Sequence, residues 1–162
     1  MKKYVYRKYS SNYPSLFNKE KQRLRKLLPA NAKIEHVGST AIPGLGGKGI
    51  LDVAIGTKNI QDCKSKLIKA GYKFKEIGGT KDRLFFKKDY GFPFFKRRVH
   101  LQLTKMNSKI WEQHIIFRNL LRKNPKLAKR YADIKEEGVK RAKGDGKIYR
   151  SHKEAFIEKY SK

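Results

Sequence analysis

The sequence predicts an α+β fold, in which a mixed β-sheet with helices packed on it is followed by a C-terminal helical segment. Up to Leu103, short runs rich in β-branched and aromatic residues alternate with amphipathic helical stretches. From Ser108 onward, apolar residues recur at helical spacing. We expect a single domain over residues 1–162, because this length allows a two-layer core and no linker divides the chain.

The helices are marked by their ends. Asn12 and Pro14 favour a helix start, and the Pro29-Ala30-Asn31 run ends that helix. A second helix is expected over residues 60–68, with Gly71 as its stop. The C-terminal segment is predicted to hold three helices: one from Ser108, one over 126–143, and one begun by a capping box of Ser151 and Glu154.

The strands are short and separated by turn residues. They are expected at 34–37, 50–55, 72–77, 83–87 and 98–103, with a turn at Gly78-Gly79. The connector 87–95 carries four aromatic residues and a proline. These aromatic residues either fill the edge of the sheet or offer a stacking surface for a base.

The stretch from Ile34 to Gly56 holds the candidate site. Asp52 interrupts an apolar run typical of a buried strand, where a charge is costly unless it is paired or holds a cation. Asp52 is therefore a metal ligand or pocket acid, or else the partner of Lys48 or Arg83 in a buried ion pair. Just before it, Gly38-Ser39 ends a strand and forms either a phosphate cradle or a purely structural turn.

The glycine-rich run from Gly44 to Gly49 satisfies G-x-G-x-x-G, but a strand follows it where a dinucleotide-binding motif requires a helix. A P-loop would need Ser or Thr after the Gly-Lys pair, and Gly49 stands there. We expect this run to be a loop that positions Lys48 near Asp52.

The composition restricts the partners. The chain has 41 basic and 14 acidic residues, a net charge of +27, which favours polyanions such as RNA unless the lysines are merely scattered and solvated. The single cysteine, Cys63, excludes an internal disulfide and is expected to be buried. No apolar run approaches the ~20 residues of a membrane span and no secretory signal is visible, so no membrane partner and a cytoplasmic location are expected.

The central stretch resembles the GrpB family, a branch of the nucleotidyltransferase superfamily with the DNA polymerase beta-like fold. A Gly-Ser pair that ends one strand and an Asp on the next are typical of the superfamily, and 12 residues separate Ser39 from Asp52 here. The family pattern in this stretch is matched by Glu35, His36, Gly38, Ser39, Thr40, Pro43, Gly44, Lys48 and Asp52. Further matches follow at Arg83, Phe86, His100, Phe117, Arg118, Arg122, Tyr131, Lys135, Tyr149, Lys153 and Phe156.

The resemblance implies a nucleotidyltransferase that uses a nucleoside triphosphate and a divalent metal, with an unspecified acceptor. It assigns catalytic roles to Asp52, Glu35, His36 and His100, with Asp52 and Glu35 as ligands of Mg²⁺. Phosphate or other ligand contacts are expected at Gly38, Ser39, Thr40, Lys48, Arg83, Gln102, Arg118 and Arg122. The alternatives are that His36 and His100 are satisfied core histidines, and that Arg83, Arg118 and Arg122 form surface ion pairs.

One departure from the superfamily pattern bears on this assignment. Two carboxylates at alternate positions of a strand point to one face and clamp Mg²⁺, but Ala54 stands where the second is expected. The alternative is therefore a non-catalytic protein that binds a nucleotide, another phosphoester or RNA. His114 and His152 are expected to be structural or exposed.

Overall fold

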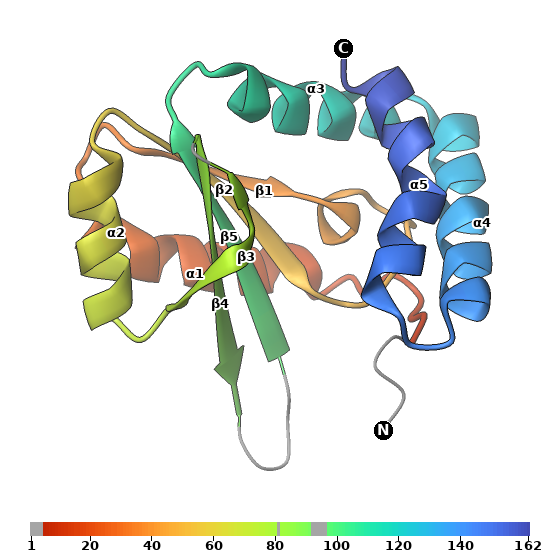
Figure 1. Ribbon diagram of the computed structural model, residues 1–162, viewed down its shortest axis with the longest axis horizontal. Helices are drawn as coiled ribbons and strands as arrows, with labels where there is room; N and C mark the ends of the chain where they lie inside the picture. Colours follow the sequence, from red (N-terminus) through yellow and green to blue (C-terminus); the bar gives the residue numbers. More distant parts are fainter. Residues whose placement is uncertain (1–4, 81, 92–96) are drawn as a thin grey trace.

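A five-stranded mixed sheet forms the centre of the fold (Figure 1). The computed structural model describes residues 5–80, 82–91 and 97–162. The strand order is β1-β2-β5-β4-β3. β2 and β5 run parallel, and the other neighbouring strands run antiparallel. The strands are β1 Lys33–Val37, β2 Leu51–Thr57, β3 Lys73–Thr80, β4 Arg83–Tyr90 and β5 Arg97–Lys105.

The helices lie on both faces of the sheet. One pair covers one face, and another helix crosses the opposite face over β1 and β2, beside two C-terminal helices that pack on each other (Figure 1). A short 3₁₀ turn, η1, follows β1. The bounds are α1 Tyr13–Leu27 and α2 Ile60–Lys69 for the pair, α3 Lys109–Lys123 for the crossing helix, α4 Pro125–Ala142 and α5 Gly146–Tyr160 for the C-terminal helices, and Ser39–Ala41 for η1. The α+β prediction, with its C-terminal helical segment, is confirmed.

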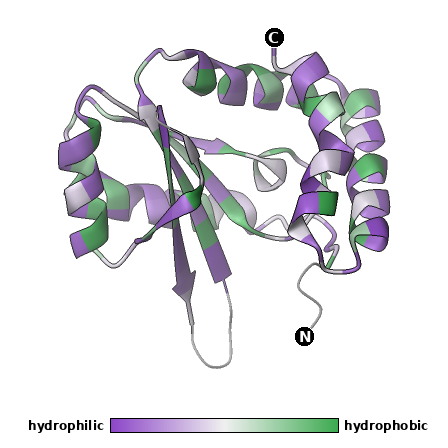
Figure 2. Cartoon of the chain, in the orientation of Figure 1, coloured by the Kyte–Doolittle hydropathy of each residue, from purple (hydrophilic) through white to green (hydrophobic). Residues whose placement is uncertain are grey.

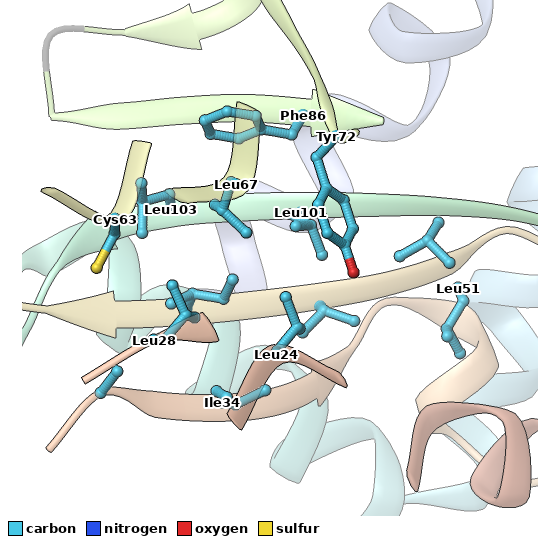
Figure 3. Close-up of a cluster of buried hydrophobic side chains, with 14 residues drawn as sticks. Leu24, Leu28, Ile34, Leu51, Cys63, Leu67, Tyr72, Phe86, Leu101 and Leu103 are labelled. Atoms are coloured by element: carbon cyan, nitrogen blue, oxygen red, sulfur yellow. The ribbon is translucent and has the colours of Figure 1, made fainter. Parts of the chain in front are cut away.

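The main core lies between the sheet and the α1–α2 pair (Figure 3). Alternate residues of β2 and β5, such as Val53 and Leu101, point into it and meet Leu24 of α1 and Leu67 of α2. Because side chains alternate along a strand, Asp52 and His100 lie on the opposite face of the sheet. The same alternation that builds the core therefore directs the polar residues towards the C-terminal helices.

A second core anchors the glycine-rich loop to the C-terminal helices. Ile42 and Leu45 of the loop are buried with Leu121, Tyr131 and Phe156. Figure 2 shows hydrophilic residues interleaved with hydrophobic ones along α4 and α5, as amphipathic helices require. This packing holds α4 and α5 close to the chain segment that follows η1.

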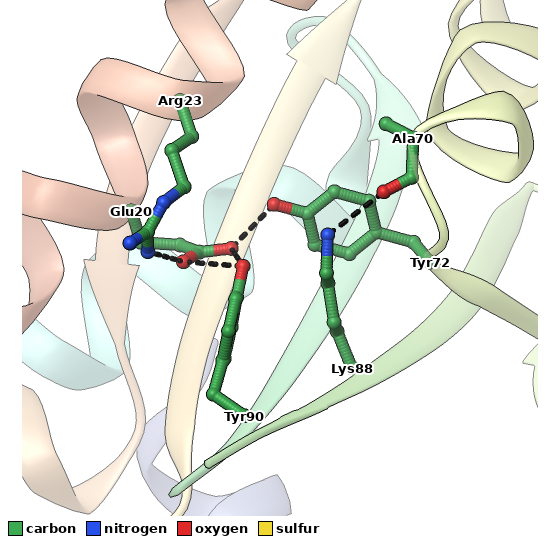
Figure 4. A network of polar contacts seen from close by, with 6 residues as sticks. All are labelled: Glu20, Arg23, Ala70, Tyr72, Lys88 and Tyr90. Carbon is green, nitrogen blue, oxygen red and sulfur yellow. Dashed lines mark hydrogen bonds and ion pairs between the residues drawn. The ribbon is translucent and has the colours of Figure 1, made fainter.

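A buried carboxylate ties α1 to β3 and β4 (Figure 4). Glu20 is fully buried, and its carboxylate accepts hydrogen bonds from the hydroxyl groups of Tyr72 and Tyr90. Arg23 adds an ion pair at 3.2 Å. These partners offset the cost of burying the charge, so the network is structural, and Tyr90 contributes to it rather than to a base-stacking surface.

Two of the predicted boundaries are wrong. Gly78 and Gly79 lie within β3 and do not form the turn, because β3 continues through an irregular register to Thr80. Ser151 does not cap a helix: it lies inside α5, where its hydroxyl donates to the carbonyl of Ile148, while Asp145 caps the helix. The remaining aromatic residues of the connector fall at 92–96, outside the described residues.

Cys63 is buried, as predicted, and its thiol donates to the hydroxyl of Thr57. Within the described part of the chain, no helix is long and apolar enough to cross a membrane.

Candidate functional site

The Asp52 carboxylate faces the glycine turn that ends β1. Val37 of β1 lies directly opposite Asp52 of β2, so the chain leaves β1 beside this carboxylate. Gly38 has φ +71°, and a Cβ placed on it would stand 2.5 Å from Asp52 Oδ2. Only glycine allows both this backbone conformation and this close approach. The predicted adjacency of Gly38 and Asp52 therefore exists in the fold.

Three lysines interact electrostatically with Asp52, and we call Lys48, Lys135 and Lys153 the lysine cluster. Lys48 comes from the glycine-rich loop, Lys135 from α4 and Lys153 from α5. Lys135 Nζ donates to the carbonyl of Gly46 at 2.8 Å. A Cβ on Gly47 would stand 2.5 Å from Lys135 Nζ and 2.7 Å from Ser39 Oγ, so this ammonium and this hydroxyl meet at Gly47.

The aromatic ring of Tyr149 orders two members of the lysine cluster. Lys48 Nζ lies 4.8 Å and Lys153 Nζ 4.9 Å from the centroid of this ring. Tyr149 is itself buried, which fixes the ring in α5. Cation–π contacts of this kind hold ammonium groups in place without neutralising them. The cluster thus remains a concentration of positive charge beside one carboxylate.

The pKa values of the lysine cluster are lowered by burial and by the repulsion between its positive charges. Burial and the charge of Lys153 lower the pKa of Lys135 to about 7 and that of Lys48 to about 8, although Asp52 opposes both shifts. Burial also lowers the pKa of Lys153. A bound anion would relieve this mutual repulsion and raise all three pKa values again.

His100 completes the surroundings of Asp52. It lies directly opposite Asp52 on β5, with Nδ1 3.5 Å from Asp52 Oδ1. Burial raises the pKa of Asp52, but the contact with His100 and the charges of Lys153 and Lys48 outweigh burial, so this pKa lies below its ordinary value. Asp52 is therefore ionised at neutral pH.

A second group of predicted site residues gathers at the edge of the sheet, in a hollow of about 250 Å³ that we call the edge hollow. Arg118 of α3 donates to Glu35 at 2.6 Å and to the carbonyl of His36 at 3.0 Å, and Arg122 donates to the carbonyl of Ala41. Thr40 also lines the hollow, together with the aromatic rings of Tyr9 and Phe17. These arginines therefore bind the protein's own carboxylate and carbonyl groups at the β1 edge.

His36 lies on the other face of the sheet from Asp52. It is buried, stacks on Phe17 of α1 at a centroid distance of 4.7 Å, and contacts Thr40 Oγ1 through Nε2 at 2.9 Å. Glu35 and His36 are consecutive in a strand and so point to opposite faces. His36 thus stabilises the η1 turn through Thr40, from the face of the sheet opposite to Asp52.

The pKa of His36 makes a prediction about acid stability. Burial, aided by Arg122 and Arg118, lowers this pKa from 6.5 to about 4, although Asp52 opposes the shift. The folded protein then binds fewer protons at this residue than the unfolded chain below pH 6.5, so stability falls as the pH falls towards 4. Wild type should lose stability between pH 7 and pH 5. We expect this loss to be about 2 kcal/mol smaller in the His36→Gln variant.

Urea unfolding of both proteins at the two pH values measures this difference. The pKa of His114 is also lowered, but His114 is present in both proteins. Its contribution to the pH dependence of stability is therefore the same in each and drops out of the comparison. Equal losses in wild type and His36→Gln would show that His36 is not the responsible group.

Two further predicted residues lie on the Asp52 face, farther from Gly38. Gln102 of β5 lies opposite Ala54 and Phe85, and Arg83 of β4 lies opposite Thr104. Arg83 does not pair with Asp52 and instead donates to the carbonyl of Gly78 at 2.9 Å. These two positions extend the polar face across β5 and β4.

The described residues do not fit a protein-bound Mg²⁺ clamp. Ala54 is fully buried at the position of the expected second carboxylate, and Glu35 is engaged by Arg118. In residues 5–80, 82–91 and 97–162, no group of three His, Cys, Asp or Glu side chains is placed to hold a metal. Among the described residues, Asp52 is the carboxylate that interacts with all three lysines.

Sequence reasoning did not assign Lys135 and Lys153 to the site, although it noted both in the family pattern. Each lies four residues after a buried tyrosine, Tyr131 or Tyr149, and so shares the inward face of its helix. A lysine on the apolar stripe of an amphipathic helix is the signal that would have indicated them.

The fold is similar to the nucleotidyltransferase fold. The chain superposes on the poly(U) polymerase Cid1 in complex with its short product ApU with a TM-score of 0.52, at 18% identity, over 80% of this chain and 43% of Cid1. This likeness establishes the architecture.

The chain belongs to the GrpB family, because the family described as GrpB protein matches residues 5–162. It is similar to the conserved protein GrpB from Enterococcus faecalis, with a TM-score of 0.83 and 27% identity over 97% of this chain and 94% of that one. It is 28% identical to the glutamate-rich protein GrpB of Alkalihalophilus pseudofirmus, over 93% of this chain and 89% of that protein. It is 32% identical to the UPF0157 protein YqkA of Bacillus subtilis over 80% of this chain, but spans only 38% of YqkA.

Proposed function

We propose that this protein binds the phosphate groups of a nucleotide at the lysine cluster, between the Gly38-Ser39 turn and helices α4 and α5. The observation that carries the proposal is the convergence of Lys48, Lys135 and Lys153 on a single carboxylate. Although burial lowers their pKa values, the three lysines together still carry more positive charge at neutral pH than one carboxylate neutralises, which favours an oligophosphate. The nucleotidyltransferase fold makes a nucleotide the expected carrier of these phosphates.

In this proposal the lysine cluster neutralises the negative charge of the phosphate groups, which a pair of metal ions neutralises in other phosphate sites. Mg²⁺ bridges phosphate oxygens and neutralises their charge in many phosphate sites. In this chain the ammonium group of Lys135 lies beside Gly47 and Ser39, which supports binding of phosphate groups without the ion.

Titration calorimetry with ATP, in EDTA and in excess Mg²⁺, tests the proposal. We expect saturable one-to-one binding in EDTA. We also expect it to survive physiological salt, because the lysines are buried and poorly screened. Absence of binding at millimolar ATP under both conditions would refute the proposal.

Nucleotidyl transfer is a second candidate, favoured by the Asp52–His100 pair beside Ser39. Asp52 is ionised and, with His100, could accept the proton of an attacking hydroxyl group. Incubation with an α-labelled nucleotide, Mg²⁺ or Mn²⁺ and candidate acceptors should then label an acceptor. Asp52→Asn should abolish the label, whereas Asp62→Asn on α2 should not. An Asp52→Asn variant that labels as well as wild type would exclude this candidate.

A further inference from the structure

A row of polar and aromatic side chains continues the Asp52 face across β5 and β4. Phe85 lies directly opposite Gln102, and Arg83 lies two residues before Phe85 on the same face. His114 of α3 is within electrostatic reach of both Arg83 and Asp52, since both affect its pKa. Arg83, Phe85 and Gln102 therefore share one face of the sheet, with His114 of α3 near them, and this face reaches Asp52 through the contact of Phe85 with His100.

Three atoms of this surface are buried without a hydrogen-bond partner among the described residues. They are Arg83 Nε, Gln102 Oε1 and His114 Nε2. Buried polar groups are nearly always satisfied in folded proteins, so an unsatisfied group requires a specific explanation. Three such atoms, from β4, β5 and α3, on a single face indicate a missing ligand group rather than separate defects.

The chemistry of the three atoms favours a ligand that offers both donors and acceptors over a purely phosphate ligand. Gln102 Oε1 only accepts hydrogen bonds, and an ionised phosphate offers no donor. Arg83 Nε only donates, and His114 Nε2 does either according to its tautomer. A nucleobase presents donors and acceptors together on one planar edge, which matches this set.

Phe85 supplies the apolar part of the surface. Its ring is half-buried and meets the His100 ring edge-on, with centroids 4.8 Å apart and an interplanar angle of 75°. Gly78 of β3 borders the ring, since a Cβ there would stand 3.5 Å from Phe85 Cδ1. Aromatic rings of this kind stack on bases.

The separation of the two regions matches one ligand. Asp52 on β2 and Phe85 on β4 are two strands and two residues apart, which places their Cα atoms about 12 Å apart by ordinary sheet dimensions. We infer that the ligand of the lysine cluster is a nucleoside triphosphate, the base of which stacks on Phe85 and is read by Arg83, Gln102 and His114. This inference rests on the proposed function and extends it to the class of ligand.

The test compares a nucleoside triphosphate with inorganic tripolyphosphate, which has the phosphates but no base. Wild type should bind its preferred member among ATP, GTP, CTP and UTP at least ~10-fold more tightly than tripolyphosphate. Gln102→Leu should weaken the nucleotide about 10-fold and leave tripolyphosphate unchanged, because only the base contact is lost. Gln61→Leu, at an exposed position on α2, is the control that should change neither affinity.

The stability of Gln102→Leu provides an independent readout. Since the variant removes a buried acceptor that has no partner, its melting temperature without ligand should not fall. Phe85→Leu should likewise reduce the preference for nucleotide over tripolyphosphate. Equal wild-type affinities for the two ligands, or an unchanged preference in both variants, would overturn the base subsite while leaving the phosphate site intact. Binding of neither ligand would refute the proposed function and this inference together.

Discussion

Replacing Lys135 with methionine is expected to weaken ATP binding about 10- to 100-fold. Lys135 is 4% exposed, and its ammonium lies beside Ser39 and Gly47. A hydrogen bond between this charged group and a phosphate contributes about 1.5–3 kcal/mol, which corresponds to that loss of affinity. Lys153→Met should behave in the same way, because both lysines interact electrostatically with the Asp52 carboxylate. Titration calorimetry of each variant measures the change.

The stability of these variants separates a binding role from a structural one. A buried ammonium is costly in the free protein, so Lys135→Met should keep or raise the melting temperature despite the lost hydrogen bond to Gly46. Lys129 lies on the same helix and its side chain is 78% exposed, so Lys129→Met is the matched control for both readouts. A Lys135→Met variant that melts many degrees lower than wild type but binds ATP normally would contradict the proposal. Lys135 would then stabilise the fold and would not contact the ligand.

The part of the site that the sequence predicts well is local. Gly38, Lys48 and Asp52 lie within 15 residues of one another, on two adjacent strands and the loop between them. Asp52 interrupts a buried strand that is adjacent to the strand ending at the Gly38 turn. Nearly every arrangement of these two strands therefore brings the Asp52 carboxylate close to that turn. In the structure the Asp52 carboxylate lies against the Gly38 turn. This contact could be predicted from the short segment alone, without knowing how distant parts of the chain pack.

The separation of the remaining residues depends on α3 as well as on strand geometry. Side chains alternate along a strand, so Glu35, opposite Ala54, shares a face with Asp52, whereas His36, opposite Val53, does not. Arg118 and Arg122 lie at the edge hollow together with Glu35, because α3, which carries both arginines, crosses the sheet over β1. The family pattern treats these residues as one set, whereas the fold separates the edge hollow from the lysine cluster.

The contribution of α4 and α5 could not be derived from the sequence alone. Lys135 lies more than 80 residues from Asp52 in the chain, and its position depends on how the second core anchors α4 to the loop at Ile42 and Leu45. Periodicity identifies the buried face of a helix, but not the part of the sheet that this face meets. Long-range placement of this kind is fixed by packing, which only the structure reveals.

Replacing Gly38 with alanine should both destabilise the protein and abolish nucleotide binding. Gly38 has φ +71° and ψ −172°, a conformation that costs other residues about 1–3 kcal/mol. The added Cβ would also stand 2.5 Å from Asp52 Oδ2, so the carboxylate must move from its place among the lysines. We expect the free energy of unfolding to fall by more than the backbone strain alone, and ATP affinity to fall at least ~10-fold.

Gly44 provides the matched control for this experiment. It has φ +79°, but a Cβ there would have no neighbouring atom within 4 Å, so Gly44→Ala introduces backbone strain without displacing Asp52. Gly44→Ala should therefore cost about 1 kcal/mol of stability and leave ATP affinity intact. If Gly38→Ala is too unstable to assay alone, the double variant Gly38→Ala/Asp52→Ala measures the clash, because removing the carboxylate should recover part of the lost stability. Equal stabilities and affinities for Gly38→Ala and Gly44→Ala would mean that the contact between the turn and the carboxylate has no role in binding.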